Sequence, residues 1–101
     1  MTLFTAGQIA YDTESNRIIN DNVEEETQQV MKNLSAVAEA ANTTLDNTVK
    51  TTVFLTDMQL FERFNAVYKE FFPDRLPARS TVMVGPLLRD VHIEIEAIIV
   101  H

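Results

Sequence analysis

A strictly alternating run near the C-terminus, from Val91 to Val100, constrains the fold more than any other stretch of the chain. Every second residue from Val91 onward is apolar, whereas the positions between them carry His92, Glu94 and Glu96 before they too become apolar. Alternation of this kind is typical of a β-strand with one buried face. The run therefore predicts a strand whose second face is charged at its start and apolar at its end.

A second strand-like run, Thr81 to Val84, precedes this one and is separated from it by Gly85-Pro86. We expect the two runs to pair as a hairpin across the Gly-Pro turn. Arg79 lies at the head of this hairpin, in the sequence Pro77-Ala78-Arg79-Ser80, where a proline fixes the backbone just before the guanidinium. Here alone the sequence places a strong anion receptor beside candidate acid and base groups.

The N-terminal half predicts strands around one long helix. Thr2 to Ile9 is a short β-like run, and Gly7 within it indicates a bulge or a backbone that a ligand or a neighbour approaches closely. Polar turn formers from Tyr11 to Asn20 predict a hairpin-like excursion. Asn22 is a good N-cap for an amphipathic helix that spans Val23 to Ala41.

The second half predicts a strand from Val49 to Thr56 and a helix from Met58 to Phe72, capped by Asp57. The element order is therefore β(β)-α-β-α-β-β. This order predicts a single α+β domain over residues 1–101, with a mixed sheet and both helices packed on one of its faces. Apolar residues also fall on the opposite face, at Phe54, Ile98 and Val100, so we expect an oligomer that packs sheets together.

Composition excludes several classes of function. The formal net charge is −7, so the chain lacks the excess of basic residues that is typical of a nucleic-acid-binding protein. The chain has no cysteine, which excludes thiolate catalysis and thiolate zinc sites. No signal peptide and no stretch of transmembrane length is visible, so we expect a cytoplasmic protein without a membrane or nucleic-acid partner.

Arg79 is the sharpest candidate for function, because arginine can hold a carboxylate through two parallel N–H bonds. The alternative is a surface or interface salt bridge, for instance with Glu94 or Glu96. Asn65 flanks the aromatic stripe of the second helix, where its amide needs partners. A pocket role and a structural cross-link are both open for this amide.

His92, Glu94 and Glu96 share one face of the final strand and could suggest a metal triad. Positions i, i+2 and i+4 of a strand span about 13 Å, however, so three ligands would hardly converge on one ion. We therefore expect no metal and favour a single carboxylate that orients water. The acidic run from Glu24 to Glu26 is interpreted as a solvated helix start rather than a metal site.

Nearly the whole chain resembles the Rid family (reactive intermediate deaminases, also called YjgF). The matching stretches follow the family's order and nearly its spacing. They are Ala6-Gly7-Gln8-Ile9, the helix end at Ala40-Ala41, Val49-Lys50-Thr51-Thr52-Val53-Phe54-Leu55, Phe64-Asn65-Ala66-Val67-Tyr68, Phe71-Phe72, Pro77-Ala78-Arg79-Ser80 and Ile93-Glu94-Ile95-Glu96-Ala97.

This resemblance implies a chorismate-mutase-like (ferredoxin-like) sandwich and a homotrimer with clefts between its subunits. It implies a hydrolase that converts short 2-imino acids to 2-oxo acids and ammonia without a cofactor. In such an enzyme Arg79 would bind the substrate carboxylate, Glu94 would orient the attacking water, and Asn65 would help line the cleft. The main chain around Gly7 and Thr81 would add hydrogen bonds.

The chain departs from the family pattern at its start. Family members usually begin with a strand that carries a Gly-Pro-Tyr-Ser-type motif, and this chain starts at the next strand. Ala6 also stands where the family often has serine. An alternative function is a non-catalytic module that binds small 2-oxo or amino acids in the same cleft. An RNA-cleaving or chaperone-like role has been attached to some relatives, but the acidic balance argues against strong RNA binding.

Overall fold

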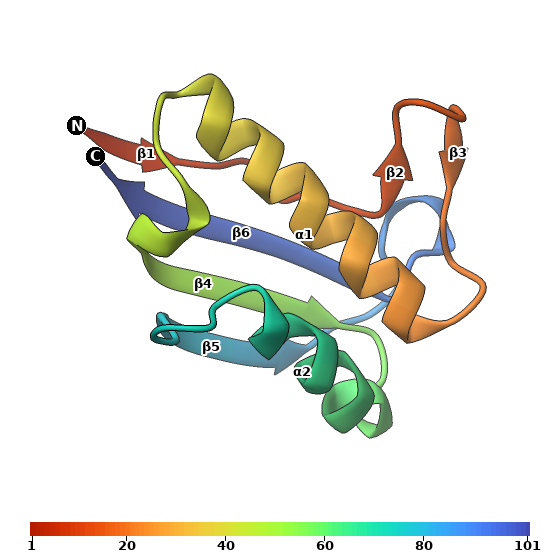
Figure 1. Ribbon diagram of the computed structural model, residues 1–101. Coiled ribbons are helices and arrows are strands. Elements are labelled where there is room, and N and C mark those ends of the chain that lie inside the picture. Colours follow the sequence, from red (N-terminus) through yellow and green to blue (C-terminus); the bar gives the residue numbers. More distant parts are fainter.

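The computed structural model describes residues 1–101 as a four-stranded mixed sheet with two helices on one face (Figure 1). The strand order in this sheet is β1-β6-β4-β5, and β2 and β3 form a separate small hairpin. In chain order the elements are β1 (Thr2–Phe4), β2 (Tyr11–Asp12), β3 (Arg17–Ile18), α1 (Val23–Ala40), β4 (Thr48–Leu55), α2 (Phe61–Glu70), β5 (Ala78–Met83) and β6 (Ile93–Val100), with short 3₁₀ turns at Leu45–Asn47, Met58–Leu60 and Leu88–Asp90.

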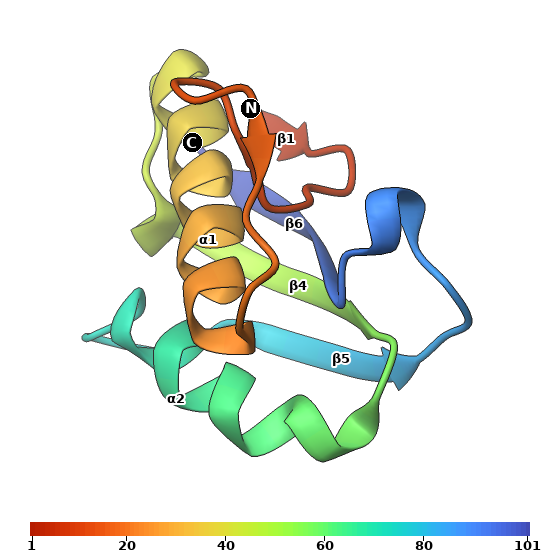
Figure 2. The ribbon, with the colours of Figure 1, turned by 90° about the vertical axis from the view of Figure 1, so that its right-hand side faces the viewer.

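The predicted terminal hairpin is wrong, because β4 lies between β5 and β6. β5 pairs parallel with one edge of β4, and β6 pairs antiparallel with the other. The connection from Val84 to Val91 is longer than a two-residue turn and crosses the end of β4, as Figure 2 shows. Neighbouring strands lie about 4.8 Å apart, so this segment has to span about 10 Å. The Gly-Pro pair is therefore part of a crossover loop.

Both helices begin and end close to where the sequence predicts. Asn22 caps α1 by accepting the backbone N–H of Glu25 at 2.8 Å. The predicted second helix is divided, because Asp57 caps a 3₁₀ turn over Met58–Leu60 that leads directly into α2. No helix combines the length and apolar character that crossing a bilayer requires.

The core lies between the helices and the covered face of the sheet. The odd-numbered residues of β6 from Ile93 to Ile99 are all buried there, as their alternation predicts. Two helices supply the other side of the core. Its largest fully buried residues are Met31 and Leu34 from α1, Phe64 and Tyr68 from α2, and Leu55 from β4.

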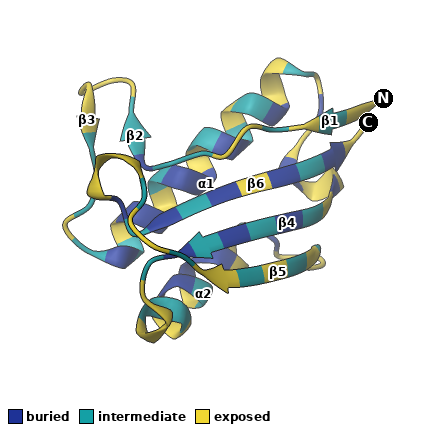
Figure 3. Ribbon diagram, turned by 180° about the vertical axis from the view of Figure 1, so that it is seen from behind, coloured by how far each residue is buried: buried dark blue, intermediate teal, exposed yellow.

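The other face of the sheet has no helix over it, as the view from behind shows (Figure 3). Several apolar side chains lie on this open face, which is defined by the positions that alternate with the buried ones. Phe4 pairs in register with Ile98, and Phe54 lies one strand further along. Phe4 is 71% exposed and Val100 is 40% exposed. The sequence therefore correctly places apolar residues on both faces of the sheet.

We predict that Ile95→Ala lowers the free energy of unfolding by about 2–4 kcal/mol. Ile95 is completely buried in the centre of β6, so the substitution removes apolar contacts and leaves a cavity. Urea denaturation followed by circular dichroism measures the change. Leu88→Ala is the control, because Leu88 is 74% exposed and its truncation should cost little. Equal effects of the two substitutions would contradict this description of the core.

Candidate functional site: two half-sites on opposite faces of the sheet

Arg79 lies on β5 with its guanidinium on the helix-covered face of the sheet. Its central carbon lies 4.8 Å from the ring centre of Tyr68, 5.2 Å from that of Phe61 and 5.8 Å from that of Phe64. Its Nη1 donates a 2.6 Å hydrogen bond to the side-chain oxygen of Asn65. Aromatic faces attract a cation and keep it in one orientation. The guanidinium is therefore held by α2 through three rings and one neutral amide.

No carboxylate of the chain forms an ion pair with Arg79, since the two ion pairs present join Arg63 to Glu24 and His92 to Glu26. The alternative in which Arg79 forms a salt bridge with Glu94 or Glu96 is not realised within the chain. A cation that is half-buried and has only a neutral partner retains free N–H donors for an anion. Arg79 is accordingly suited to receive a carboxylate from outside the chain.

The aromatic residues around Arg79 follow from the helical spacing of α2, on which Phe61, Phe64 and Tyr68 recur at intervals of three and four. The Tyr68 hydroxyl shares a 2.7 Å hydrogen bond with the Thr51 hydroxyl of β4. Burial raises the pKa of the Tyr68 phenol above its ordinary value, and the bond to Thr51 and the nearby Arg79 charge offset this only in part. Tyr68 is therefore a neutral side chain, fixed by Thr51, whose ring packs against the guanidinium.

Thr81 follows Arg79 by two residues on the same face of β5 and lines an open groove of about 530 Å³. Met58, Gln59, Phe61 and Glu62 form the rest of this groove, at the beginning of α2. Phe61 contacts both the groove and the guanidinium. A molecule whose carboxylate binds Arg79 thus has space for the rest of its structure along the groove. We call Arg79, Asn65 and Thr81 the arginine half-site.

Glu94 lies on the open face, because it alternates with the buried Ile93 and Ile95 in β6. Its carboxylate lies against Gly7, where an added Cβ would come within 2.2 Å of Oε2. The sequence prediction that a neighbour approaches Gly7 closely is confirmed, and that neighbour is Glu94. We call Gly7 and Glu94 the glutamate half-site.

A single chain does not bring these two half-sites together. Arg79 lies on the helix-covered face, whereas Glu94 lies on the open face and two strands away, beyond β4. The expectation that the carboxylates of the final strand face Arg79 across a hairpin is wrong, because β4 separates the two strands and the alternation of β6 directs Glu94 away. One chain therefore holds Arg79 and Glu94 on opposite faces of its sheet.

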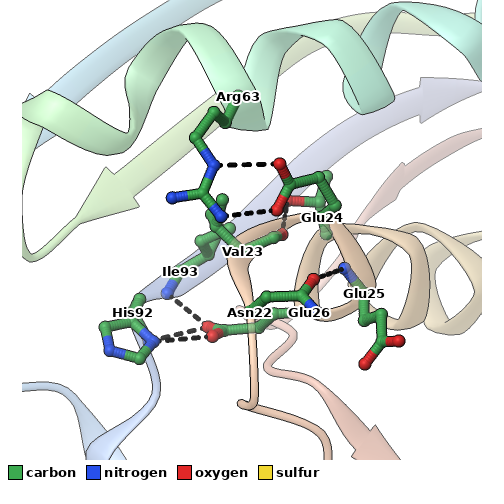
Figure 4. Close-up of polar contacts among 9 residues, drawn as sticks. Asn22, Val23, Glu24, Glu25, Glu26, Arg63, His92 and Ile93 are labelled. Atoms are coloured by element: carbon green, nitrogen blue, oxygen red, sulfur yellow. Dashed lines mark hydrogen bonds and ion pairs between the residues drawn. The ribbon is translucent and has the colours of Figure 1, made fainter.

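We interpreted the acidic run from Glu24 to Glu26 as a solvated helix start. This interpretation is wrong for Glu26, whose carboxylate is fully buried. Figure 4 shows it accepting hydrogen bonds from the backbone of His92 and Ile93 and from the His92 ring. His92 therefore turns towards α1, on the covered side of the sheet. It does not share a face with Glu94 and Glu96, and no group of three His, Cys, Asp or Glu residues converges to hold a metal.

The signal for Glu26 was present in the sequence. Position 26 lies one helical turn before Val30 and one turn after Val23, which places it on the apolar stripe of α1. Because two further acidic residues precede it, Glu26 was interpreted as part of a solvated run. Glu24, by contrast, is only partly buried and forms a two-bond pair with Arg63 at 2.8 and 2.9 Å.

Comparison with known proteins identifies the class. The family model described as Endoribonuclease L-PSP matches residues 1–101. A RutC family protein of Saccharolobus solfataricus is 46% identical over 95% of this chain and 76% of its own length. The 2-iminobutanoate/2-iminopropanoate deaminase of mouse is 41% identical over 98% of this chain and 73% of its own length.

A solved structure agrees in fold. Escherichia coli TdcF with bound serine superposes with a TM-score of 0.94 and 37% identity, covering 99% of this chain and 80% of that one. The chain belongs to the Endoribonuclease L-PSP family, also known as the YjgF, RutC or Rid family.

Tyr68→Phe should lower the free energy of unfolding by about 1 kcal/mol at neutral pH, since it removes the hydrogen bond with Thr51. It should also change the response to alkali. The raised pKa of Tyr68 means that the unfolded chain releases this proton first, so stability falls once the pH exceeds about 10. Urea denaturation at several pH values between pH 8 and pH 11 measures this effect. The free energy of unfolding should fall less steeply with pH in Tyr68→Phe than in the wild type. If the free energy of unfolding falls equally steeply with pH in the wild type and in Tyr68→Phe, burial does not hold the Tyr68 phenol neutral.

Proposed function

We propose that the protein hydrolyses short 2-imino acids to 2-oxo acids and ammonia. The observation that carries this proposal is the state of Arg79, a half-buried cation held by three aromatic rings and one amide with no carboxylate partner. A guanidinium held in this way binds a planar carboxylate with two parallel hydrogen bonds. Every 2-imino acid carries such a carboxylate next to its reactive carbon.

The reaction then needs water and one carboxylate base. Glu94 would take a proton from water as its oxygen attacks the C2 carbon of the imine, which gives a tetrahedral carbinolamine. Glu94 then returns the proton to the nitrogen, which makes it a leaving group. As the hydroxyl oxygen forms the C=O bond and its proton passes back to the Glu94 carboxylate, the C–N bond breaks, ammonia leaves and the 2-oxo acid remains. The sum is one imine and one water consumed for one ketone and one ammonia released. A protonated imine is already a strong electrophile, so the proposal requires no cofactor.

The proposed site is completed by a second copy of the chain. Arg79 and Glu94 lie on opposite faces of the sheet, so one chain cannot present both to one small molecule. We propose a homotrimer in which the arginine half-site of one subunit meets the glutamate half-site of the next. The open face supports this assembly, since Phe4 and Val82 are well exposed on it. Closed symmetry would then create one equivalent site at each interface.

The relatives support the same substrate class. The mouse relative bears the name of a deaminase for 2-iminobutanoate and 2-iminopropanoate. The structure of TdcF contains serine, a small molecule with a carboxylate and a nitrogen on the neighbouring carbon. An Arg79 carboxylate receptor fits both kinds of molecule. The net charge of −7 disfavours the polyanionic substrate that the word endoribonuclease in the family description suggests.

We predict that the wild-type protein accelerates ammonia and 2-oxobutanoate release from freshly generated 2-iminobutanoate, and that Arg79→Ala lowers kcat/KM at least about 100-fold. Removal of the guanidinium deprives the substrate carboxylate of its binding partner. Arg75→Ala is the matched control, because Arg75 is exposed and lies on a different hollow with Asp46 and Asp74. Full activity of Arg79→Ala would refute the assigned role.

A second candidate is a module that binds small 2-oxo or amino acids without turnover. The arginine half-site favours it, because Arg79, Asn65 and Thr81 all lie on one chain, so this binding role needs no residue of a second copy. Thermal denaturation with 2-oxobutanoate separates the two functions. A melting temperature that rises with ligand in wild type but not in Arg79→Ala, without imine turnover, would favour the binding module.

A further inference from the structure

Glu26 is a buried carboxylate that the proposed reaction does not use. Its side chain has no exposed surface, although it lies within an otherwise exposed acidic run. A charge buried in this way is costly unless hydrogen bonds replace its lost water. The surroundings supply three such bonds, so the first question is what these bonds hold in place.

The three bonds all go to the start of β6. Oε2 accepts the backbone N–H of His92 at 2.7 Å and that of Ile93 at 2.8 Å. Oε1 lies 2.8 Å from Nδ1 of the His92 ring. One carboxylate thus fixes two consecutive peptide units and the side chain between them (Figure 4). Bonds to an ionised acceptor are stronger than bonds between neutral groups.

β1 does not support this end of β6. β1 pairs with β6 only from Ile98 to Val100, and an isolated bridge between Gln8 and Ile95 is the last backbone pairing on that side. β4 supports the other side, where Thr56 donates its N–H to the carbonyl of His92. At the start of β6, directly after the crossover loop, Glu26 thus accepts backbone N–H groups that a neighbouring strand would otherwise bind.

Glu94 is the next residue after the two peptide units that Glu26 holds. Its carboxylate has little freedom, because Gly7 lies directly against it. A small rotation of the His92 or Ile93 peptide would move the Glu94 Cα and alter the direction of its side chain. Displacements of this size matter at a reacting centre, where about 1 Å can cost about 100-fold in rate.

We propose that Glu26 is a positioning residue that holds the start of β6 and thereby aims Glu94 at its water. This inference rests on the proposed function of Glu94. It assigns no contact with substrate to Glu26, which lies on the covered side of the sheet. The ring of His92 strengthens the arrangement but supplies only one of the three bonds, since the other two come from the backbone.

The chemistry predicts which substitution of Glu26 the protein tolerates. In Glu26→Gln the amide oxygen can occupy the Oε2 position and accept both backbone N–H groups. The amide NH₂ can then donate to an unprotonated Nδ1 of His92. All three bonds survive in Glu26→Gln, whereas Glu26→Ala loses all of them and leaves two backbone N–H groups without an acceptor. The two variants therefore separate loss of the bonds from loss of the charge.

The test measures imine turnover and amide hydrogen exchange in the same four variants. They are Glu26→Ala, Glu26→Gln, Glu24→Ala and Leu34→Ala. Glu24→Ala removes a neighbouring carboxylate whose ion pair is with Arg63, away from β6, and Leu34→Ala destabilises α1 two turns further along through a cavity. All measurements are made at a temperature at which each variant is folded.

We expect Glu26→Ala to lower kcat roughly 10- to 100-fold with little change in KM, because Arg79 still binds the carboxylate. Glu26→Gln should keep most of the activity, and the two control variants should keep kcat. Exchange at the amides from His92 to Ile95 should speed up in Glu26→Ala alone.

Wild-type-like kcat in Glu26→Ala, or an equal fall in Leu34→Ala, would overturn the positioning role. If the wild type shows no turnover, the proposed function fails. The exchange experiment still decides whether Glu26 holds the segment that carries Glu94, and unchanged exchange in Glu26→Ala would refute this.

Discussion

The alternation of side chains across one antiparallel strand governs the rest of the molecule. In β6 the odd-numbered residues from Ile93 to Ile99 all enter the core, where they pack with buried residues of the two helices. Glu94 is thereby directed to the open face. Arg79 of β5 points to the covered face, where α2 holds it. The same packing that stabilises the fold thus separates the two groups that the proposed reaction needs, which is why the proposed site requires a second copy of the chain.

The covered and open faces are nevertheless linked through the backbone of β6. Glu26 binds this strand from the covered side at Ile93, and Glu94 leaves it on the open side one residue later. The crossover loop that precedes β6 carries Arg89 and Asp90 with positive φ, a conformation that costs energy in residues with side chains. A strand that begins immediately after such a loop needs an anchor, and the buried carboxylate provides one.

Local signals in the sequence predicted the helices, the strands and the apolar open face well. The cap at Asn22, the stripe of α2 and the alternation of β6 each depend on residues a few positions apart. The false hairpin had a different origin. A Gly-Pro pair between two strands suggests that the strands are neighbours in the sheet. β5 and β6 are not neighbours, because β4 pairs with each of them, and this long-range pairing leaves no local signal in the sequence. The same limit applied to the site, because residue types indicated Arg79 and Glu94 but not that they lie on opposite faces. The position of Glu26 on the apolar stripe of α1 was a local signal for its burial, but its partners His92 and Ile93 lie far away in sequence, so its bonds to them were not predictable.

Mixing two inactive variants tests most directly whether the site is shared between chains. Arg79→Ala retains the glutamate half-site, and Glu94→Gln retains the arginine half-site. When equal amounts are unfolded together and refolded, about a quarter of the interfaces in a cyclic trimer should pair two intact half-sites. Our account predicts that imine hydrolysis returns to about that fraction of the wild-type rate, while each variant refolded alone stays inactive. Mixed assemblies that form but recover no activity would contradict a site built from opposite faces of two neighbouring chains.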